Sequence, residues 1–147
     1  MTENAKDTNP KDAIGADKLP LDLVPDTAIA LASLAHLDGA LRYGKWNWRV
    51  AGVRSSIYVA AIKRHLAAYE NGEDIAADGV HHLGHILACV NIIVDAGACG
   101  KLTDDRPPSM RIAEWIANLT PWVRVLKDRN KDRNPRHWSI TDSEVLS

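Results

Sequence analysis

Apolar residues recur along the chain with the spacing of helices, and the first clear case follows a proline-rich segment over residues 18–25. We expect that segment to be extended, because a residue before proline disfavours the helical conformation. Asp26 is a good N-cap, and apolar residues then recur at intervals of four, three and four. This pattern predicts a helix over residues 26–43 that ends at Gly44.

Three more helices are predicted beyond a loop over residues 44–54 that is rich in Trp and Arg. One spans about residues 56–71, with a serine at its start and Asn71-Gly72 as its end. The next runs from about residue 78 to 95, and the last begins at a Ser109 cap and stops at Pro121. In the helix over residues 78–95, the apolar positions expected to form the core stripe are Leu83, Ile86, Leu87, Val90 and Val94.

These elements predict an all-α helical bundle, because no segment shows a convincing strand pattern and the loops are short. The 147 residues suffice for one domain with a core and are few for two. We expect a flexible N-terminal arm over residues 1–17, a helical domain over residues 18–121 and a tail over residues 122–147. A partner copy is expected to complete so small a bundle, as a dimer or tetramer.

Composition argues against several classes of protein. The 18 basic and 19 acidic residues nearly cancel, so no overall field attracts nucleic acid, and the basic tail over residues 124–136 is interrupted by two acids. No apolar run approaches the ~18 residues typical of a membrane span. Two cysteines cannot build a disulfide framework, which favours a reducing cytoplasm.

Charge is segregated along the chain. Residues 39–69 hold six basic residues and no acidic one, whereas residues 70–100 hold five acidic residues and no Lys or Arg. Basic side chains can hold phosphates, and carboxylates with imidazoles can hold a divalent cation. If the two helices pack antiparallel, these segments meet and supply the minimal parts for metal-assisted hydrolysis of a phosphoanhydride. The alternative is that both charge runs are ordinary solvated faces.

Three histidines stand close together in the acidic segment. On a helix, His81 or His82 shares a face with His85, and two histidines with a carboxylate form a metal-ligand arrangement. The alternative is that one histidine acts as ligand or base while the others are hydrogen-bonded packing residues.

The loop over residues 43–49 combines aromatic rings, an amide and two cations. Aromatic rings can stack on a base, Asn can read a purine edge, and Lys or Arg can meet phosphate. The alternative is that Trp46 or Trp48 anchors the loop to the core.

The chain also resembles a known family through a series of short motifs in a fixed order. These motifs are Asn9-Pro10-Lys11-Asp12, Lys18-x-Pro20-Leu21-x-Leu23-x-Pro25, Gly39-Ala40-x-x-Tyr43-Gly44, Asn47-Trp48-Arg49, Arg64-His65, Gly72-Glu73, Gly79-Val80-His81-His82-Leu83-x-His85 and Asp104-Asp105-Arg106-Pro107. Over about residues 9–108 the chain resembles the dATP/dGTP diphosphohydrolase family, MazG-like proteins often carried by phages. If a phage carries the gene, the expected location is the cytoplasm of a bacterial host.

The resemblance implies an all-α, MazG-like nucleotide pyrophosphohydrolase. Such an enzyme would cleave a purine dNTP between its α- and β-phosphates, giving dNMP and pyrophosphate, with Mg²⁺ or Mn²⁺. Typical MazG enzymes carry E-x-x-E and then E-x-x-D on successive helices. Here the one E-x-x-E is Glu70 to Glu73 and no E-x-x-D follows, so the ligand set is expected to differ. The alternative is an inactive phage protein that binds and sequesters nucleotides.

The expected reaction is attack on the α-phosphorus by a water that metal ions polarise. The expected metal ligands are Glu73 and His82, with Asp95 and His85 as further candidates. The catalytic candidates are His65, Glu73 and His85, of which the histidines would orient or deprotonate the water. The expected substrate-binding residues are Lys18, Tyr43, Lys45, Asn47, Trp48, Arg49, Arg54 and Arg64.

Overall fold

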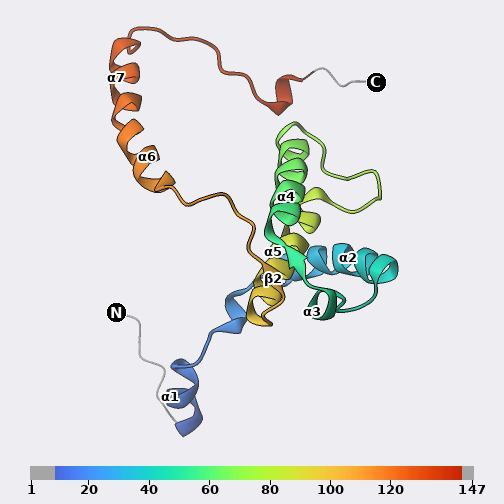
Figure 1. Cartoon of the computed structure of the whole chain (residues 1–147). Coiled ribbons are helices and arrows are strands. Elements are labelled where there is room, and N and C mark those ends of the chain that lie inside the picture. The colour runs from blue at the N-terminus through green and yellow to red at the C-terminus, as the bar shows by residue number, and fades with distance from the viewer. Residues whose placement is uncertain (1–8, 144–147) are drawn as a thin grey trace.

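The computed structural model describes residues 9–143 and is mostly helical (Figure 1). Its helices are α1 (Pro10–Ala16), α2 (Asp26–Tyr43), α3 (Trp48–Ala51), α4 (Ser55–Glu70), α5 (His82–Ala98), α6 (Ile112–Leu119) and α7 (Pro121–Arg129). The strands β1 (Val53–Arg54) and β2 (Leu102–Thr103) and two 3-10 helices (Leu21–Leu23 and Ile140–Asp142) are short. The expected all-α fold class is confirmed.

Helix α5 is the central element, and both α2 and α4 pack against it (Figure 1). Helices α4 and α5 are antiparallel: His65, late in α4, meets His82 at the start of α5, while Ser56 meets Asp105 beyond the end of α5. The basic and the acidic segments of the sequence therefore lie side by side.

Helices α2 and α5 approach each other closely at Gly84. A Cβ atom there would lie 2.9 Å from the carbonyl oxygen of Leu31, nearer than real Cβ atoms come to a backbone atom. The buried positions nearby are also small, namely Ala32, Ala35 and Ala88. The core is built from small residues, and no large side chain within residues 9–143 is fully buried.

A parallel strand pair joins the segments that flank α4 and α5, so the expectation of no strand is wrong for these four residues. Val53 pairs with Leu102, and its N–H donates to the Lys101 carbonyl at 3.0 Å. Gly52 makes this approach possible, because its φ is +78° and a Cβ atom would lie 2.9 Å from the same carbonyl oxygen. Two-residue strands are too short for an alternating pattern to reveal them.

Helix α5 begins later than predicted, at His82, because the side chain of His81 accepts the Leu83 N–H at 3.0 Å and acts as the N-cap. The preceding residues form a turn in which the Asp78 carboxylate accepts a backbone N–H. The helix also passes its predicted end and continues to Ala98.

The predicted Ser109 cap is wrong as well, since α6 begins at Ile112 after Arg111, whose side chain makes no capping bond. Pro121 ends α6 as predicted, but it also begins α7, because proline suits the first position of a helix. Helices α6 and α7 contact each other and project away from α2, α4 and α5 (Figure 1). No helix within the described residues has the length and apolar character needed to cross a membrane.

The N-terminal segments differ from their expected description. Of the arm expected over residues 1–17, residues 1–8 lie outside the described part of the chain, and residues 10–16 form α1, which Asn9 caps by accepting the Lys11 N–H. The segment over residues 18–25, which is predicted to be extended, contains the 3-10 helix Leu21–Leu23.

The core stripe predicted for α5 is only partly correct. Val90 and Val94 are exposed, as are Leu34, Leu37 and Leu41 of α2. These apolar faces are uncovered in a single chain, and assembly into a dimer or tetramer stays a prediction.

Candidate functional site

A group of side chains from α3 is held by Asp95, late in α5. Its Oδ2 atom accepts hydrogen bonds from Trp48 Nε1 at 2.6 Å and Arg49 Nε at 2.8 Å, and its Oδ1 atom accepts one from Arg49 Nη2 at 2.8 Å. The bonds from Arg49, and then that from Trp48, lower the pKa of Asp95 to about 2. Asp95, expected as a metal ligand, is thus joined to two residues expected to bind substrate.

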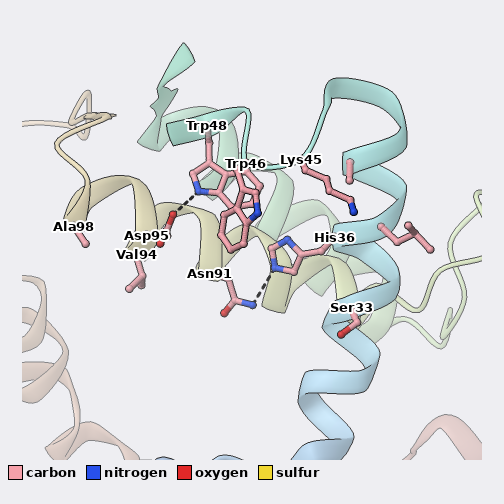
Figure 2. A pocket seen from close by; sticks show the side chains of 11 residues that line it. Ser33, His36, Lys45, Trp46, Trp48, Asn91, Val94, Asp95 and Ala98 are labelled. Atoms are coloured by element: carbon pink, nitrogen blue, oxygen red, sulfur yellow. Dashed lines mark hydrogen bonds between the residues drawn. The ribbon is translucent and has the colours of Figure 1, made fainter. Parts of the chain in front are cut away.

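A cavity of about 690 Å³ opens beside this group (Figure 2). We call it the aromatic pocket, because the rings of Trp46, Trp48 and His36 line it together with the amide of Asn91. The ring centroids of Trp46 and Trp48 are 5.3 Å apart, and those of His36 and Trp48 are 5.9 Å apart. Lys45 also lines the pocket, where it supplies an exposed cation.

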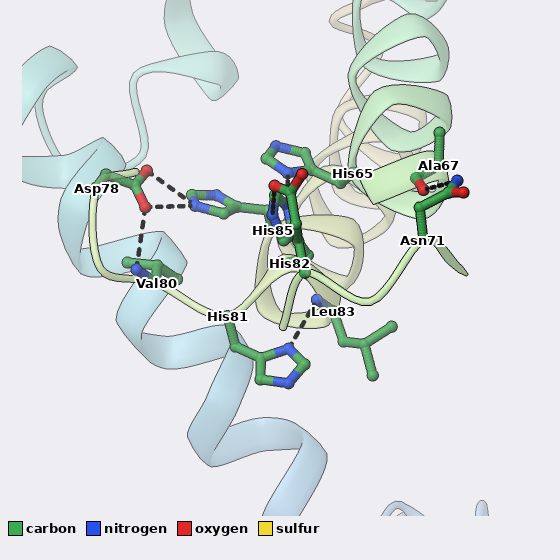
Figure 3. Close-up of polar contacts among 10 residues, drawn as sticks. His65, Ala67, Asn71, Asp78, Val80, His81, His82, Leu83 and His85 are labelled. Carbon is green, nitrogen blue, oxygen red and sulfur yellow. Dashed lines mark hydrogen bonds and ion pairs between the residues drawn. The ribbon is translucent and has the colours of Figure 1, made fainter. Parts of the chain in front are cut away.

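The second group, which we call the histidine cluster, lies where α4 meets the first turn of α5 (Figure 3). It consists of His65, His82 and His85 with the carboxylates of Glu73 and Asp78. The Nδ1 atoms of His65 and His82 are 2.8 Å apart, and the rings of His65 and His85 stack with centroids 4.4 Å apart.

The contact between two Nδ1 atoms couples the tautomers of His65 and His82, because one nitrogen must carry the proton and the other must accept it. If His82 donates, its Nε2 atom presents a lone pair. If His65 donates, the neutral His82 ring carries its proton on Nε2 instead. A ligand that binds at His82 Nε2 therefore sets the protonation of both rings.

The His82 Nε2 atom is buried and has no hydrogen-bond partner among the described residues. The nearest carboxylate is Glu73, whose Oε2 atom lies 3.7 Å away, and the Glu73 side chain is 70% exposed against 8% for His82. Because an unpaired buried nitrogen is costly, the geometry favours a ligand that reaches it from the Glu73 side.

These atoms fit a divalent cation only in part. Within residues 9–143 no three His, Cys, Asp or Glu side chains are placed to hold one ion together. Glu73 and His82 offer two donors, and Mg²⁺ is commonly held by one or two carboxylates with substrate phosphates and water. His85 and Asp95, the further candidates for metal ligands, are each paired with other side chains.

His85 is paired with Asp78, with its Nε2 atom 2.9 Å from Oδ2 and 3.1 Å from Oδ1. Burial opposes ionisation of Asp78, but hydrogen bonds from the Val80 N–H and from His85 outweigh it and lower the pKa. Arg42 approaches the same carboxylate at 4.0 Å. This pair fixes the His85 ring against His65.

The pKa of His65 is lowered, first by its burial and then by the neighbouring His85 and His82. His65 is therefore neutral near neutral pH and can accept a proton. When its Nδ1 atom donates to His82, this capacity falls to Nε2; in the other tautomer pair Nε2 carries the proton.

A smaller cavity of about 180 Å³ shares lining residues with both groups. It is lined by His85 on one side and by His36 and Trp48 of the aromatic pocket on the other, and also by Tyr43 and Asn47. Two of the expected substrate-binding residues thus lie between the aromatic pocket and the histidine cluster.

The other expected cations are placed less uniformly. Arg64 follows Lys63 on α4, and its charge contributes to the lowered pKa of His65. Arg54 lies at the N-terminal end of α4, away from Arg64, and Lys18 is exposed in the segment before Leu21. The structure brings neither of these two to the histidine cluster.

Five residues that form or contact these groups are absent from the expected set. One is Trp46, which the sequence marks only as an aromatic residue of the loop over residues 43–49. Asp78 and Arg42 could have been suspected from the charge segregation, as an acid and a base in facing segments. His36 and Asn91 carry no local signal, because 55 residues separate them.

Comparison with known proteins gives one match. The model of a family described as dATP/dGTP diphosphohydrolase, N-terminal, matches residues 8–106. No curated protein and no solved structure matches the chain. The matched segment holds all the residues of the histidine cluster and of the aromatic pocket, and it ends before α6.

Proposed function

Because the chain belongs to the dATP/dGTP diphosphohydrolase family, we propose that it hydrolyses purine deoxynucleoside triphosphates to dNMP and pyrophosphate. The observation that carries this proposal is the buried, unpartnered His82 Nε2 atom, which faces Glu73 beside a neutral His65. A buried nitrogen without a partner, a carboxylate and a general base thus lie within one cluster.

In this mechanism a water oxygen attacks the α-phosphorus while the bond to the oxygen bridging the α- and β-phosphates breaks. The proton of the water passes to His65 Nε2, and pyrophosphate leaves with the bonding electrons. His82 holds the His65 ring through the shared Nδ1 contact, and Asp78 holds His85 against its other side. The cluster thus keeps the base oriented.

Cations near the cluster would bind the triphosphate. Arg64 directly precedes His65 in the sequence, and the Arg42 guanidinium lies 4.0 Å from the Asp78 carboxylate. We propose Mg²⁺ or Mn²⁺ as the cofactor, with Glu73 as its protein ligand. His82, the other expected ligand, carries its proton on Nε2 and donates it to a phosphate oxygen, because His65 Nε2 is free to take a proton only when His65 donates from Nδ1. When bound, such an ion neutralises phosphate charge and lowers the pKa of water.

The test is incubation of the full chain with each dNTP and NTP, with Mg²⁺, Mn²⁺ or a chelator, followed by chromatography. We expect dNMP and pyrophosphate from purine dNTPs and a loss of both products with the chelator. Glu73→Gln should lower kcat by about 100-fold or more. Glu70→Gln, also exposed but outside the cluster, is the matched control. Equal rates for the two variants would remove Glu73 from the site.

The second candidate is nucleotide binding without turnover. The observation that favours it is the lack, in residues 9–143, of three side chains placed to hold one ion. If the protein only binds nucleotides, adding a triphosphate should raise its melting temperature while the triphosphate stays intact. Pyrophosphate release would exclude this alternative.

A further inference from the structure

The aromatic pocket has a use beyond phosphate chemistry. We infer that it binds the purine base of the nucleotide and that Asn91 selects a 6-amino purine, adenine or a base with the same edge. This inference rests on the proposed function for the site that the phosphates would occupy.

The shape and lining of the pocket suit a flat aromatic ligand. Its volume of about 690 Å³ is in the range of small-molecule sites, and two indole rings and an imidazole line it (Figure 2). Aromatic side chains stack on bases without regard to sequence. The Trp46 ring is 55% exposed, so an incoming base can reach it.

The backbone of Trp46 is held in an uncommon conformation. Its φ is +61°, and it is the one such non-glycine residue among residues 9–143. A bulky residue in this region is strained, and the surrounding contacts maintain the strain. Those contacts include Arg49, whose guanidinium lies 4.4 Å from the centroid of the Trp46 ring. The indole is therefore fixed before a ligand arrives.

His36 orients the amide of Asn91. The two side chains meet at 3.2 Å between Asn91 Nδ2 and His36 Nε2. Burial lowers the pKa of His36, so the ring is neutral and its Nε2 atom can accept the amide hydrogen. The carbonyl oxygen of Asn91 is then directed away from His36 (Figure 2).

An amide in this orientation keeps one N–H and its carbonyl oxygen for a ligand. This pair matches adenine, whose N7 accepts and whose 6-amino group donates. Guanine presents two acceptors, N7 and O6, on the same edge. Asn91 therefore favours the adenine pattern.

The pocket is also at the right distance from the histidine cluster. Asn91 and His85 both lie on α5, six residues apart, which is about 9 Å along the helix axis. The smaller cavity is lined by both His85 and His36 and so borders both groups. One nucleotide can therefore reach both, with its base in the pocket and its phosphates at the cluster.

The test is calorimetric titration of the full chain with dAMP and dGMP, neither of which can be cleaved to pyrophosphate. We expect dAMP to bind about 10-fold more tightly than dGMP. Trp46→Ala should weaken both by about 10-fold or more, because stacking does not depend on the base. Asn91→Ala should weaken dAMP alone and abolish the preference.

Two matched controls separate the pocket from general effects. Trp138→Ala removes another exposed indole that carries a guanidinium, that of Arg136, at 3.9 Å. Asn118→Ala removes another exposed asparagine from a helix. Both variants should bind dAMP as the unmodified chain does.

The outcomes also separate this inference from the proposed function. If neither monophosphate binds, or if the pocket variants bind as the controls do, the pocket assignment is overturned whatever the rate of hydrolysis. If the pocket variants lose dAMP binding while the unmodified chain leaves dATP intact, the pocket is supported and the hydrolase proposal falls.

Discussion

The close approach of α2 and α5 at Gly84 allows one substitution to be worked through. In Gly84→Ala the new Cβ atom would lie 2.9 Å from the Leu31 carbonyl oxygen and 3.3 Å from its Cγ atom. A backbone oxygen cannot turn aside as the end of a side chain can, so the two helices must separate. Forcing an extra carbon into a packed contact costs about 1–3 kcal/mol.

The matched control is Gly39→Ala, because Gly39 lies within α2 and its added Cβ atom would have no neighbour within 4 Å. Alanine is favoured over glycine in a helix by up to about 1 kcal/mol, and both variants gain this term. The difference between them therefore isolates the steric cost. We expect Gly84→Ala to be less stable than Gly39→Ala by about 1–3 kcal/mol.

The assay is urea unfolding of both variants and the unmodified chain, followed by circular dichroism. A melting experiment gives the same ranking, at about 2–4 °C per kcal/mol for a domain of this size. Because Gly84 stands between His82 and His85, the strained variant should also lose hydrolysis. Equal or greater stability of Gly84→Ala would refute the close contact.

Three further predictions concern single contacts. The pKa of Asp95 is lowered from 3.8 to about 2, so its ionised form stabilises the fold fully above pH 3.8 and this stabilisation is lost as the pH falls through about 2. Asp95→Asn should therefore reduce the dependence of the melting temperature on pH over this range, and an unchanged dependence would contradict the pairing. Asp105→Ala removes two hydrogen bonds to Ser56 at the start of α4, whereas Asp104→Ala removes bonds only to Arg106 in the same turn. Asp105→Ala should therefore lower the melting temperature more, and the reverse order would count against the contact with Ser56. Trp46→Gly relieves a positive φ that Trp46→Ala retains, so the glycine variant should be more stable by about 1 kcal/mol in urea unfolding, and a less stable glycine variant would argue against strain.

Local patterns predict the main helices well. Both α2 and α4 lie within one residue of their predicted ranges, because apolar periodicity and the glycines that follow them act over a few residues. The pattern predicts too early a start for α5, because Asp78 satisfies a nearby backbone group in a turn instead of capping a helix. The pattern does not predict α7, because Pro121 suits a helix start as well as a helix end.

The candidate site is less accessible to such reasoning. Helical spacing predicts that His82 and His85 lie together, and the antiparallel packing of α4 and α5 then adds His65. The partners of Asp95 lie 46 and 47 residues away, so no local pattern could indicate that Trp48 and Arg49 occupy its oxygens. Contacts of this range depend on how α3 seats on α5, which sequence periodicity does not specify.

His85 and Asn91 both lie on α5, so the geometry of this one helix fixes their distance and orientation relative to each other. A single residue inserted between them would turn one relative to the other by about 100° and shift it by about 1.5 Å. No loop lies between the two positions to absorb such a change. Insertions should therefore be tolerated in the segment between β2 and α6 far better than in this part of α5, and a change of substrate would have to come through side-chain replacement.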